Sequence, residues 1–504
     1  MKGLRVLRAE WTKFRTVRGW VLGVFGAALA SVLFLLAGTT SSNQQAHDAA
    51  ALPVGPGGEA VNDSFYFVHQ ALTGDGSITV PVIALVGALA QEPGQTSSGV
   101  TPWAKTGILV KQSLGQGSPY AAMMVTGAHG VRMQDDFTHD RAGLPGRPSA
   151  DAPRWLRLVR AGSTVSGYDS ADGVRWNDVG SVHLAGLAAT VQVGLFTASP
   201  AAVQTSGSRA GTSPAVATGT FGGVTLDGPW TRDGRQDGWQ GVQVGGDAGT
   251  SGSYAQDTTG GYRQTGKGFT VTGAGDIAPV VGGPALGPAY TIENFLVGTF
   301  VGLIVLTVVA TQFVTAEYRR GLIGTTLAAM PRRGRLLAAK AAVVMAVAFA
   351  VGVVVAAVSI PFGRQRAHAT HFLVLTVPHA VELRAVLGTG LLLAATAVLS
   401  LALGAVFRRS ATAITAVVVT TVLPYLLAVS GMLPTAPARW LLRLTPAAGF
   451  AVQQTLPRYA HVLTDYTPSS GYFPLSPWGG YGVLGGWAIL SLAAAILVLR
   501  RRDV

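Results

Sequence analysis

EYRRGLIGTTLAAMPRRGRLLAAK, residues 317–340, separates two long runs of uncharged and mostly apolar residues, 294–314 and 341–360. The stretch holds six Lys and Arg residues and a single acid, Glu317. A helix needs about 20 apolar residues to cross the hydrocarbon of a bilayer, and each flanking run reaches that length. The sequence therefore predicts two membrane-spanning helices joined by a short basic loop, residues 315–340.

The same apolar pattern recurs in four other places. Only 12% of the 504 residues are charged and 49% are hydrophobic, whereas a soluble protein has about 25% charged residues. The other windows that lack Lys, Arg, Asp and Glu are 19–38, 385–406, 411–433 and 479–499. We therefore expect a polytopic α-helical membrane protein with six transmembrane helices. Gly298 and Gly302 in the second of these helices form a G-x-x-x-G pair, which indicates close helix packing.

The charges are distributed unevenly along the chain. Residues 39–290 hold 14 Lys and Arg against 18 Asp and Glu, a net charge of −4, whereas the rest holds 23 against 6, a net charge of +17. Of those 23 cations, only six lie in the loops 361–384 and 434–478, which fall on one side of the membrane. The other 17 fall on the opposite side, and short cytoplasmic segments are the ones enriched in Lys and Arg. We expect a plasma-membrane protein with cytoplasmic termini, an extracytoplasmic segment 39–293 and no nucleic-acid partner.

The long segment between the first two spanning helices has a β pattern. Residues 61–228 read as short apolar strands separated by turn signals, which favours an all-β sandwich inserted between the helices. The dipeptide Asp172-Gly173 is typical of a hairpin turn. We expect residues 39–60 to be a linker and residues 229–293 to be a glycine-rich satellite or linker. The chain has no Cys, so disulfides cannot hold this segment together.

Motifs for nucleotide and metal binding are weak. Residues 261–268, GYRQTGKG, nearly match a phosphate-binding loop, but Gly268 stands where a hydroxyl should hold Mg²⁺. The chain is therefore expected not to hydrolyse ATP and to have no catalytic residues. His368, His371 and His379 lie close together in sequence without a matching carboxylate, so no metal site is predicted.

The N-terminal residues 1–18 predict an amphipathic helix on the cytoplasmic membrane surface. Its apolar positions recur at intervals of three and four residues, as one face of a helix requires. The residues of this face are Leu4, Leu7, Trp11 and Phe14. A plain basic tail that fixes the topology is the alternative.

The run WLRLVRAGSTVSGYDSADGVRWNDVGS, residues 155–181, resembles the concanavalin A-like lectin and glucanase sandwich. The resemblance implies a fold and little about activity. Trp155 and Trp176 could stack on sugar rings, although core packing explains them as well. A hydrolase would need paired carboxylates, for which the clustered Asp135, Asp136 and Asp140 are candidates, and a solvated loop explains these too.

LRAEWTKFRTVRGW before the first helix, AEYRRGLIGTTLAAMPRRGRLLAAK after the second, and six spans resemble the type-2 permeases of ATP-binding-cassette transporters. The resemblance implies a separate ATPase subunit that binds MgATP and a second permease chain, identical or different, while this chain itself binds no cofactor. In the family, the loop after the second span carries a coupling helix that contacts the ATPase. The matching residues here are Glu317, Tyr318, Arg319, Arg320, Gly321, Thr325 and Thr326, followed by the basic turn Arg332, Arg333 and Arg335. Glu10 and Lys13 would join Trp11 in the flanking N-terminal helix.

The resemblance further implies that loop 434–478 is an external re-entrant segment. Most family members have only a short connection between the first two spans, whereas about 250 residues intervene here. The resulting hypothesis is the permease subunit of an exporter with an unknown substrate. The alternative is a membrane-anchored protein that binds or senses carbohydrate outside the cell, and a cell-wall hydrolase is a third possibility.

Overall fold

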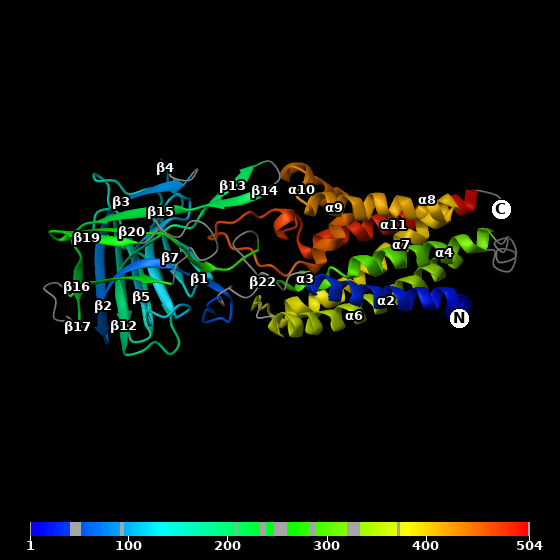
Figure 1. Cartoon of the computed structure of the whole chain (residues 1–504), viewed down its shortest axis with the longest axis horizontal. Helices are drawn as coiled ribbons and strands as arrows, with labels where there is room; N and C mark the ends of the chain where they lie inside the picture. The colour runs from blue at the N-terminus through cyan, green and yellow to red at the C-terminus, as the bar shows by residue number, and fades with distance from the viewer. Residues whose placement is uncertain are drawn as a thin grey trace.

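The structure is a computed structural model that describes residues 2–40, 52–90, 95–206, 209–231, 238–245, 260–282, 289–319, 333–369 and 373–501. A bundle of long helices and a β sandwich lie end to end (Figure 1). Both chain termini lie at the end of the bundle that is far from the sandwich (Figure 1). We call this the terminal end of the bundle, and the opposite end the sandwich end.

Six helical segments in the described part of the chain are long and apolar enough to cross a membrane. Their members are α2 (Arg18–Thr40), α3 and α4 (Ile292–Leu296 and Thr299–Arg319), α6 (Arg333–Ala369), α7 (His379–Phe407), the run α8, η2 and α9 (Ser410–Val417, Val418–Val422 and Leu423–Val429), and α11 (Pro477–Arg501). The predicted fold class, six spanning helices with an inserted all-β sandwich, is confirmed.

Close contacts between small residues hold the bundle together. The backbone of α2 passes directly over Gly298 and Gly302, because a Cβ at Gly298 would lie 2.0 Å from the Ser31 carbonyl oxygen and one at Gly302 would lie 2.4 Å from Ser31 Oγ. Gly352 of α6 and Gly390 of α7 meet in the same way. Small residues let helix backbones approach closely where lipid offers no hydrophobic driving force, so the predicted close packing at Gly298 and Gly302 is confirmed.

The sandwich consists of two antiparallel sheets. One has the order β11-β10-β9-β3-β15-β20-β19, with β4 and β16 also on β3, and the other has the order β17-β2-β12-β5-β6-β7-β8, with β18 also on β2. The first sheet contains β3 (Gly76–Ala90), β4 (Thr96–Ser98), β9 (Arg154–Ala161), β10 (Thr164–Ser170), β11 (Asn177–His183), β15 (Ala215–Phe221), β16 (Thr225–Asp227), β19 (Gly261–Thr265) and β20 (Gly268–Gly273). The second contains β2 (Phe65–Thr73), β5 (Lys105–Lys111), β6 (Tyr120–Thr126), β7 (Val131–Asp135), β8 (His139–Ala142), β12 (Thr190–Ala198), β17 (Trp230–Thr231) and β18 (Gln240–Val244). Val80, Ile108 and Leu195 are among the residues of its fully buried core.

The sandwich extends beyond residue 228, which corrects the expected boundary. Strand β18 pairs with β2, and β20 pairs with β15, so residues 229–293 supply strands to both sheets instead of forming a satellite. The near match to a phosphate-binding loop, residues 261–268, forms β19 and its turn into β20, with Gly266 at φ +59°. The hairpin at Asp172-Gly173 joins β10 to β11 as expected, and Gly173 has φ +73°.

The chain enters and leaves the sandwich through neighbouring strands. Strand β1 (Val61–Asp63) pairs antiparallel with β21 (Ile277–Pro279), and Val61 faces Pro279. Loop 434–478, which contains α10 (Thr435–Leu444) and the buried 3₁₀ helix η3 (Pro446–Gln453), reaches the sandwich from the bundle. There the buried His461 forms a hydrogen bond of 2.9 Å between its Nε2 and the Phe137 carbonyl oxygen. The sandwich is therefore docked on the bundle, beyond its two covalent connections.

Candidate coupling site

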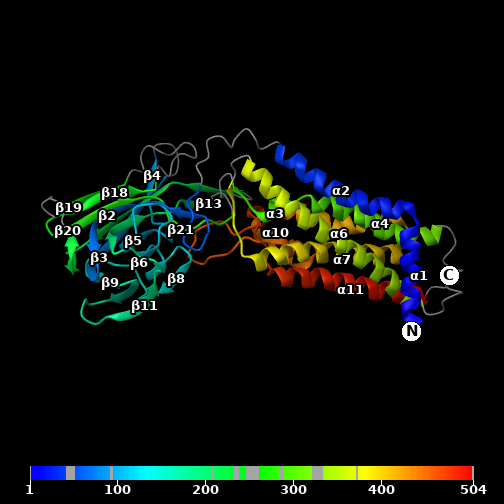
Figure 2. The same cartoon turned by 90° about the horizontal axis from the view of Figure 1, so that it is seen from below.

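Helix α1 (Lys2–Thr16) lies across the terminal end of the bundle, at a steep angle to α2 (Figure 2). Phe14 is buried and packs edge-on against Phe313 of α4, with 5.4 Å between ring centroids. Leu7 and Trp11 are 37% and 46% exposed, so they remain free to contact lipid. The side chain of Leu4 lies outside the described residues. The predicted apolar face of this helix is thus divided between the protein core and the surface.

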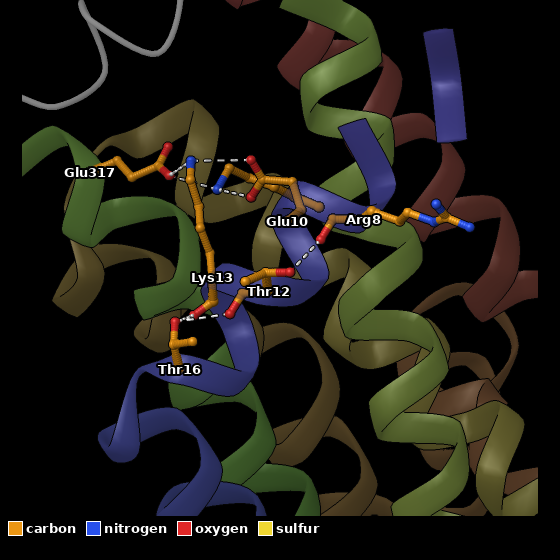
Figure 3. Close-up of polar contacts among 7 residues, drawn as sticks. Arg8, Glu10, Thr12, Lys13, Thr16 and Glu317 are labelled. Atoms are coloured by element: carbon orange, nitrogen blue, oxygen red, sulfur yellow. Dashed lines mark hydrogen bonds and ion pairs between the residues drawn. The ribbon is translucent and has the colours of Figure 1, made fainter. Parts of the chain in front are cut away.

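Four charged side chains from α1, α4 and α6 form one ion-pair cluster. Lys340 Nζ lies 2.7 Å from Glu10 Oε2 and 2.8 Å from Glu317 Oε1. Lys13 Nζ lies 3.2 Å from Glu10 Oε1 and 3.2 Å from the same Glu317 Oε1 (Figure 3). Two carboxylates and two ammonium groups balance each other, so we call Glu10, Lys13, Glu317 and Lys340 the charge cluster.

The charge cluster is mostly buried. Its side chains are 0% exposed at Glu10, 2% at Lys340 and 10% at Glu317, whereas Lys13 is 42% exposed. Lys340 Nζ also lies 4.4 Å above the centroid of the Phe313 ring, where the face of the ring attracts a cation. Charged side chains are almost never fully buried unless they are paired, so these three helices are held in register by electrostatics as well as by packing.

Lys13 is the member of the charge cluster that reaches solvent. Partial burial lowers the pKa of Lys13, but the neighbouring carboxylates of Glu317 and Glu10 more than offset this effect, so the pKa is raised overall. Glu317 Oε2 is buried and has no hydrogen-bond partner among the described residues. One buried acceptor of the cluster therefore remains unused at the residue where the basic loop begins.

The structure brings together part of the predicted coupling residues. Glu317 lies with Glu10 and Lys13 in the charge cluster. The Arg408 guanidinium lies 5.3 Å from the centroid of the Tyr318 ring. Arg319 ends α4, Arg333 begins α6, and Arg335 is exposed on the first turn of α6. The predicted residues Arg320, Gly321, Thr325, Thr326 and Arg332 lie outside the described residues.

Sequence reasoning missed the role of Lys340. It was counted only as one of the basic loop's cations, although it is followed by an apolar run of 20 residues. One signal could have revealed its role. The basic part of the chain has only six acids, so Glu10 and Glu317 are conspicuous as candidate partners for a lysine at a helix end.

The two tryptophans of the sandwich both contact their own chain. Trp155 covers Gly173, where an added Cβ would lie 2.8 Å from the indole ring. The Arg157 guanidinium stacks on Trp176 at 3.9 Å from the ring centroid. Both side chains are partly exposed, and a role in glycan contact stays a prediction.

The three clustered aspartates do not form a solvated loop. Asp135 is buried and lies 3.2 Å from Arg141 Nη1 and 2.9 Å from His139 Nδ1. Asp140 pairs with Arg132. Asp136 accepts a hydrogen bond from the Tyr120 amide in a backbone conformation with φ +43°. These carboxyl groups support the turn between β7 and β8.

Six helices of spanning length, an inserted sandwich and a buried charge cluster at the opposite end define a multi-pass membrane protein with one extramembrane domain. The model of the family described as "ABC-2 family transporter protein" matches residues 4–504. The chain therefore belongs to the ABC-2 family of transporter proteins. Among proteins with curated descriptions, none matches the chain.

Some solved structures resemble part of the chain. One is a functionally unknown protein from Saccharomyces cerevisiae, with 15% identity over 36% of this chain and 83% of that chain and a TM-score of 0.23. Another is scytalido-glutamic peptidase with a peptide-based transition state analogue, with 9% identity over 44% of this chain and 100% of that chain and a TM-score of 0.25. At these TM-scores neither likeness carries an argument about fold or function.

Proposed function

We propose that this permease component of an ABC transporter is the membrane subunit of an exporter in the cytoplasmic membrane. A separate ATPase subunit, which binds MgATP, would drive it through the loop between α4 and α6. The substrate is unidentified. In this proposal the terminal end of the bundle faces the cytoplasm, because 17 of the 23 Lys and Arg residues outside segment 39–290 belong to the termini and short loops expected on that side. The sandwich then lies outside the cell.

The charge cluster is the observation that carries the proposal. Glu317 and Lys340 lie on the two helices that flank the proposed coupling loop, and they pair with each other. Glu317 also pairs with Lys13 of α1, and Lys340 also pairs with Glu10 of α1. Any element that pushes on the loop moves the ends of α4 and α6 first. Because three of the four side chains are buried and paired, α1 would move with these two ends.

This arrangement supports a rigid-body transmission of force. Closure of the ATPase on MgATP would shift the loop, and the paired helix ends would carry the shift into α4, α6 and α1 together. Helix α2 follows α1 after a single residue, Val17, and packs on α4 at Gly298 and Gly302. The shift would therefore reach the sandwich end through two neighbouring helices.

A second permease chain is part of the proposal. Helix α2 presents an exposed apolar face to the outside of the bundle, and its large side chains are Leu22, Phe25, Leu29, Leu33 and Phe34. Such a face requires lipid or another helix bundle as its neighbour. We propose a homodimer or heterodimer of permease chains surrounded by lipid.

Co-expression with the companion ATPase tests the coupling role. The chain has no Cys, so Thr325→Cys provides a single cross-linking site in the proposed coupling helix. We expect Thr325→Cys to cross-link to the ATPase, and Lys340→Met to lower ATP turnover of the reconstituted complex about tenfold, the equivalent of roughly 1.4 kcal/mol in the barrier.

Two further variants separate coupling from folding. Arg15 is an exposed cation on α1, the helix that also carries Glu10 and Lys13. Arg15→Met should leave ATP turnover unchanged. Glu10→Gln combined with Lys340→Met keeps the balanced pair Lys13–Glu317, so this variant should fold stably and still couple poorly. If no ATPase co-purifies with the chain, or if Lys340→Met turns over ATP like the unmodified complex, the proposed coupling role is wrong.

A further inference from the structure

A cavity of about 770 Å³ lies where the sandwich meets the helical bundle. Its walls come from the segment before β1, from β21, from the first turns of α7, and from residues 454–459 of loop 434–478. The segments that line it, such as β21 and the first turns of α7, belong to the sandwich end of the bundle, whereas α1 lies at the terminal end (Figure 2). Its volume is in the range of small-molecule sites, which is about 300–1,000 Å³.

Two arginines in the cavity wall, Arg384 and Arg458, form no ion pair with a carboxylate among the described residues. Arg384 donates a hydrogen bond from Nη2 to the Gln454 carbonyl oxygen, and its Nε–H is buried without a partner among the described residues. Arg458 stacks on Tyr466 at 4.8 Å, and no ion pair to it is found in the part of the chain that the structure describes. By contrast, Arg364 on the neighbouring helix α6 forms a two-pronged pair with Glu382, at 3.0 and 2.8 Å.

Glu293 acts electrostatically on Arg384 but forms no ion pair with it among the described residues. Glu293 accepts three hydrogen bonds from Thr455 and Leu456, so its carboxylate is already engaged. Glu59 lines the cavity, and burial raises the pKa of its carboxyl group. Its Oε1 is buried without a partner among the described residues.

Helix α7 begins at the same cavity. Pro378 and His379 line it, and the Pro378 carbonyl oxygen already accepts from the amides of Val381 and Glu382. The N-terminus of a 29-residue helix carries partial positive charge, which adds to the field of the two arginines. The polar side of the cavity therefore favours an anion.

The remaining wall is largely apolar. Val280, Leu375 and Leu456 line the cavity and also belong to one packed cluster with Ala60 and Tyr472. A small inorganic anion would leave this wall in contact with water, whereas a hydrocarbon chain would cover it.

We propose that this cavity binds an amphiphile with one anionic head, a carboxylate or a phosphate, and an apolar tail. The head contacts Arg384 and Arg458, and the tail lies against Val280, Leu375 and Leu456. The ligand comes from the membrane as an anionic phospholipid or from the medium as a free acidic amphiphile. This proposal does not depend on the coupling mechanism, because binding can be measured without an ATPase.

Native mass spectrometry of the full chain in neutral detergent tests the proposal. The probes are dodecyl phosphate, palmitoyl-oleoyl phosphatidylglycerol, dodecanol and inorganic phosphate. We expect dodecyl phosphate to bind at least tenfold more tightly than dodecanol or inorganic phosphate. Binding of phosphatidylglycerol as well would identify the membrane as a source, and binding of dodecyl phosphate alone would identify the medium.

Variants locate the bound probe. The double variant Arg384→Gln, Arg458→Gln should weaken the binding of dodecyl phosphate at least tenfold. Arg439 is an exposed arginine of loop 434–478 that does not line the cavity, so Arg439→Gln should leave this binding unchanged. Val381→Trp fills the cavity and leaves both arginines in place, so it should also abolish binding. This variant tests the proposal if the double variant does not fold. Equal binding by the unmodified chain and Val381→Trp, equal binding of dodecanol and dodecyl phosphate, or no binding of either anionic amphiphile overturns the proposal.

Discussion

Buried lysines occur in both parts of this molecule, and they are paired in different ways. In the sandwich, Lys111 Nζ lies 2.7 Å from Asp63 Oδ2 and Lys105 Nζ lies 2.7 Å from Asp276 Oδ1. Each of these lysines has one carboxylate partner and one backbone carbonyl, from Ser118 and Ile277. In the bundle, Lys340 shares two carboxylates with Lys13.

The difference follows from what each pair connects. Lys105 and Lys111 are the two ends of β5. Lys105 pairs with Asp276, which precedes β21, and Lys111 pairs with the last residue of β1, so both pairs lie where the chain leaves and enters the sandwich. These one-to-one pairs fix strands of a single domain. The charge cluster joins three helices, and each carboxylate has two possible cations. A shared network can lengthen one contact and keep another, which suits helix ends that would shift together under the proposed coupling.

Loss of Lys111 should have the largest effect on stability. Lys111→Met leaves the buried Asp63 carboxylate without its cation, and breaking such a pair costs about 3–5 kcal/mol. We expect a clear drop in the denaturant midpoint of the sandwich, followed by tryptophan fluorescence of the full chain. Asp63→Leu in the same chain should restore much of the loss, and an unchanged midpoint in Lys111→Met would show that the pair contributes no stability.

Lys340→Met should destabilise the protein less than Lys111→Met does and should lower its activity more. Lys13 still neutralises one of the two remaining carboxylates, so we expect a loss of about 2 kcal/mol for a buried charged acceptor left without its partner. The thermal midpoint of the helical bundle, followed by circular dichroism at 222 nm, measures this loss. A loss as large as that of Lys111→Met would contradict the view that the cluster shares its charges.

Lys13→Met should have a small effect. Lys13 is 42% exposed, whereas its partners Glu10 and Glu317 are buried and keep Lys340 as their second cation. Solvent screens the ammonium group of Lys13, so we expect a contribution near that of exposed pairs, about 0.2–1 kcal/mol. The same measurement of the bundle midpoint applies, and the remaining effect should shrink in high salt because solvent-exposed charges are screened. A salt-independent loss would place Lys13 deeper in the network than its exposure indicates.

Alkaline pH should change the stability of the sandwich and of the helical bundle in opposite directions. Burial lowers the pKa of Lys111, and the Asp63 carboxylate offsets only part of this effect. Just below pH 10.5 the unfolded chain therefore binds more protons at this lysine than the folded chain does. Raising the pH in this range stabilises the sandwich. The pKa of Lys13 is raised overall, so its stabilising contribution is complete below pH 10.5 and is lost as the pH rises through its folded pKa. Midpoints measured between pH 9 and 11, each compared with the corresponding Met variant, should shift in opposite directions. A shift of the same sign at both sites would refute this comparison.

Most of the fold was predictable because hydropathy and alternation are local signals. The six spanning segments and strands such as β3, β5 and β12 are clear from short windows of sequence. Strands β18 and β20 were missed as members of the sheets, because glycine-rich segments carry few apolar residues and their partners β2 and β15 are distant in sequence.

The site was less predictable because its contacts are long-range. The resemblance indicated Glu10, Lys13 and Glu317 as residues near the proposed coupling helix, but a pair such as Lys340–Glu10 joins residues 330 positions apart. No periodicity or spacing reports such a contact. Burial of Glu10 was equally hidden, because it follows from how α1 packs on α6 and not from the apolar face of α1 itself.

The pairing of β1 with β21 has a consequence for protein engineering. Val61 and Pro279 face each other across two antiparallel strands, and such residues are about 5 Å apart. A very short peptide would thus bridge the excised segment and give a permease without the sandwich. The same junction would accept an unrelated domain whose termini are adjacent, so that a reporter or binding module could be displayed on this transporter in place of the sandwich.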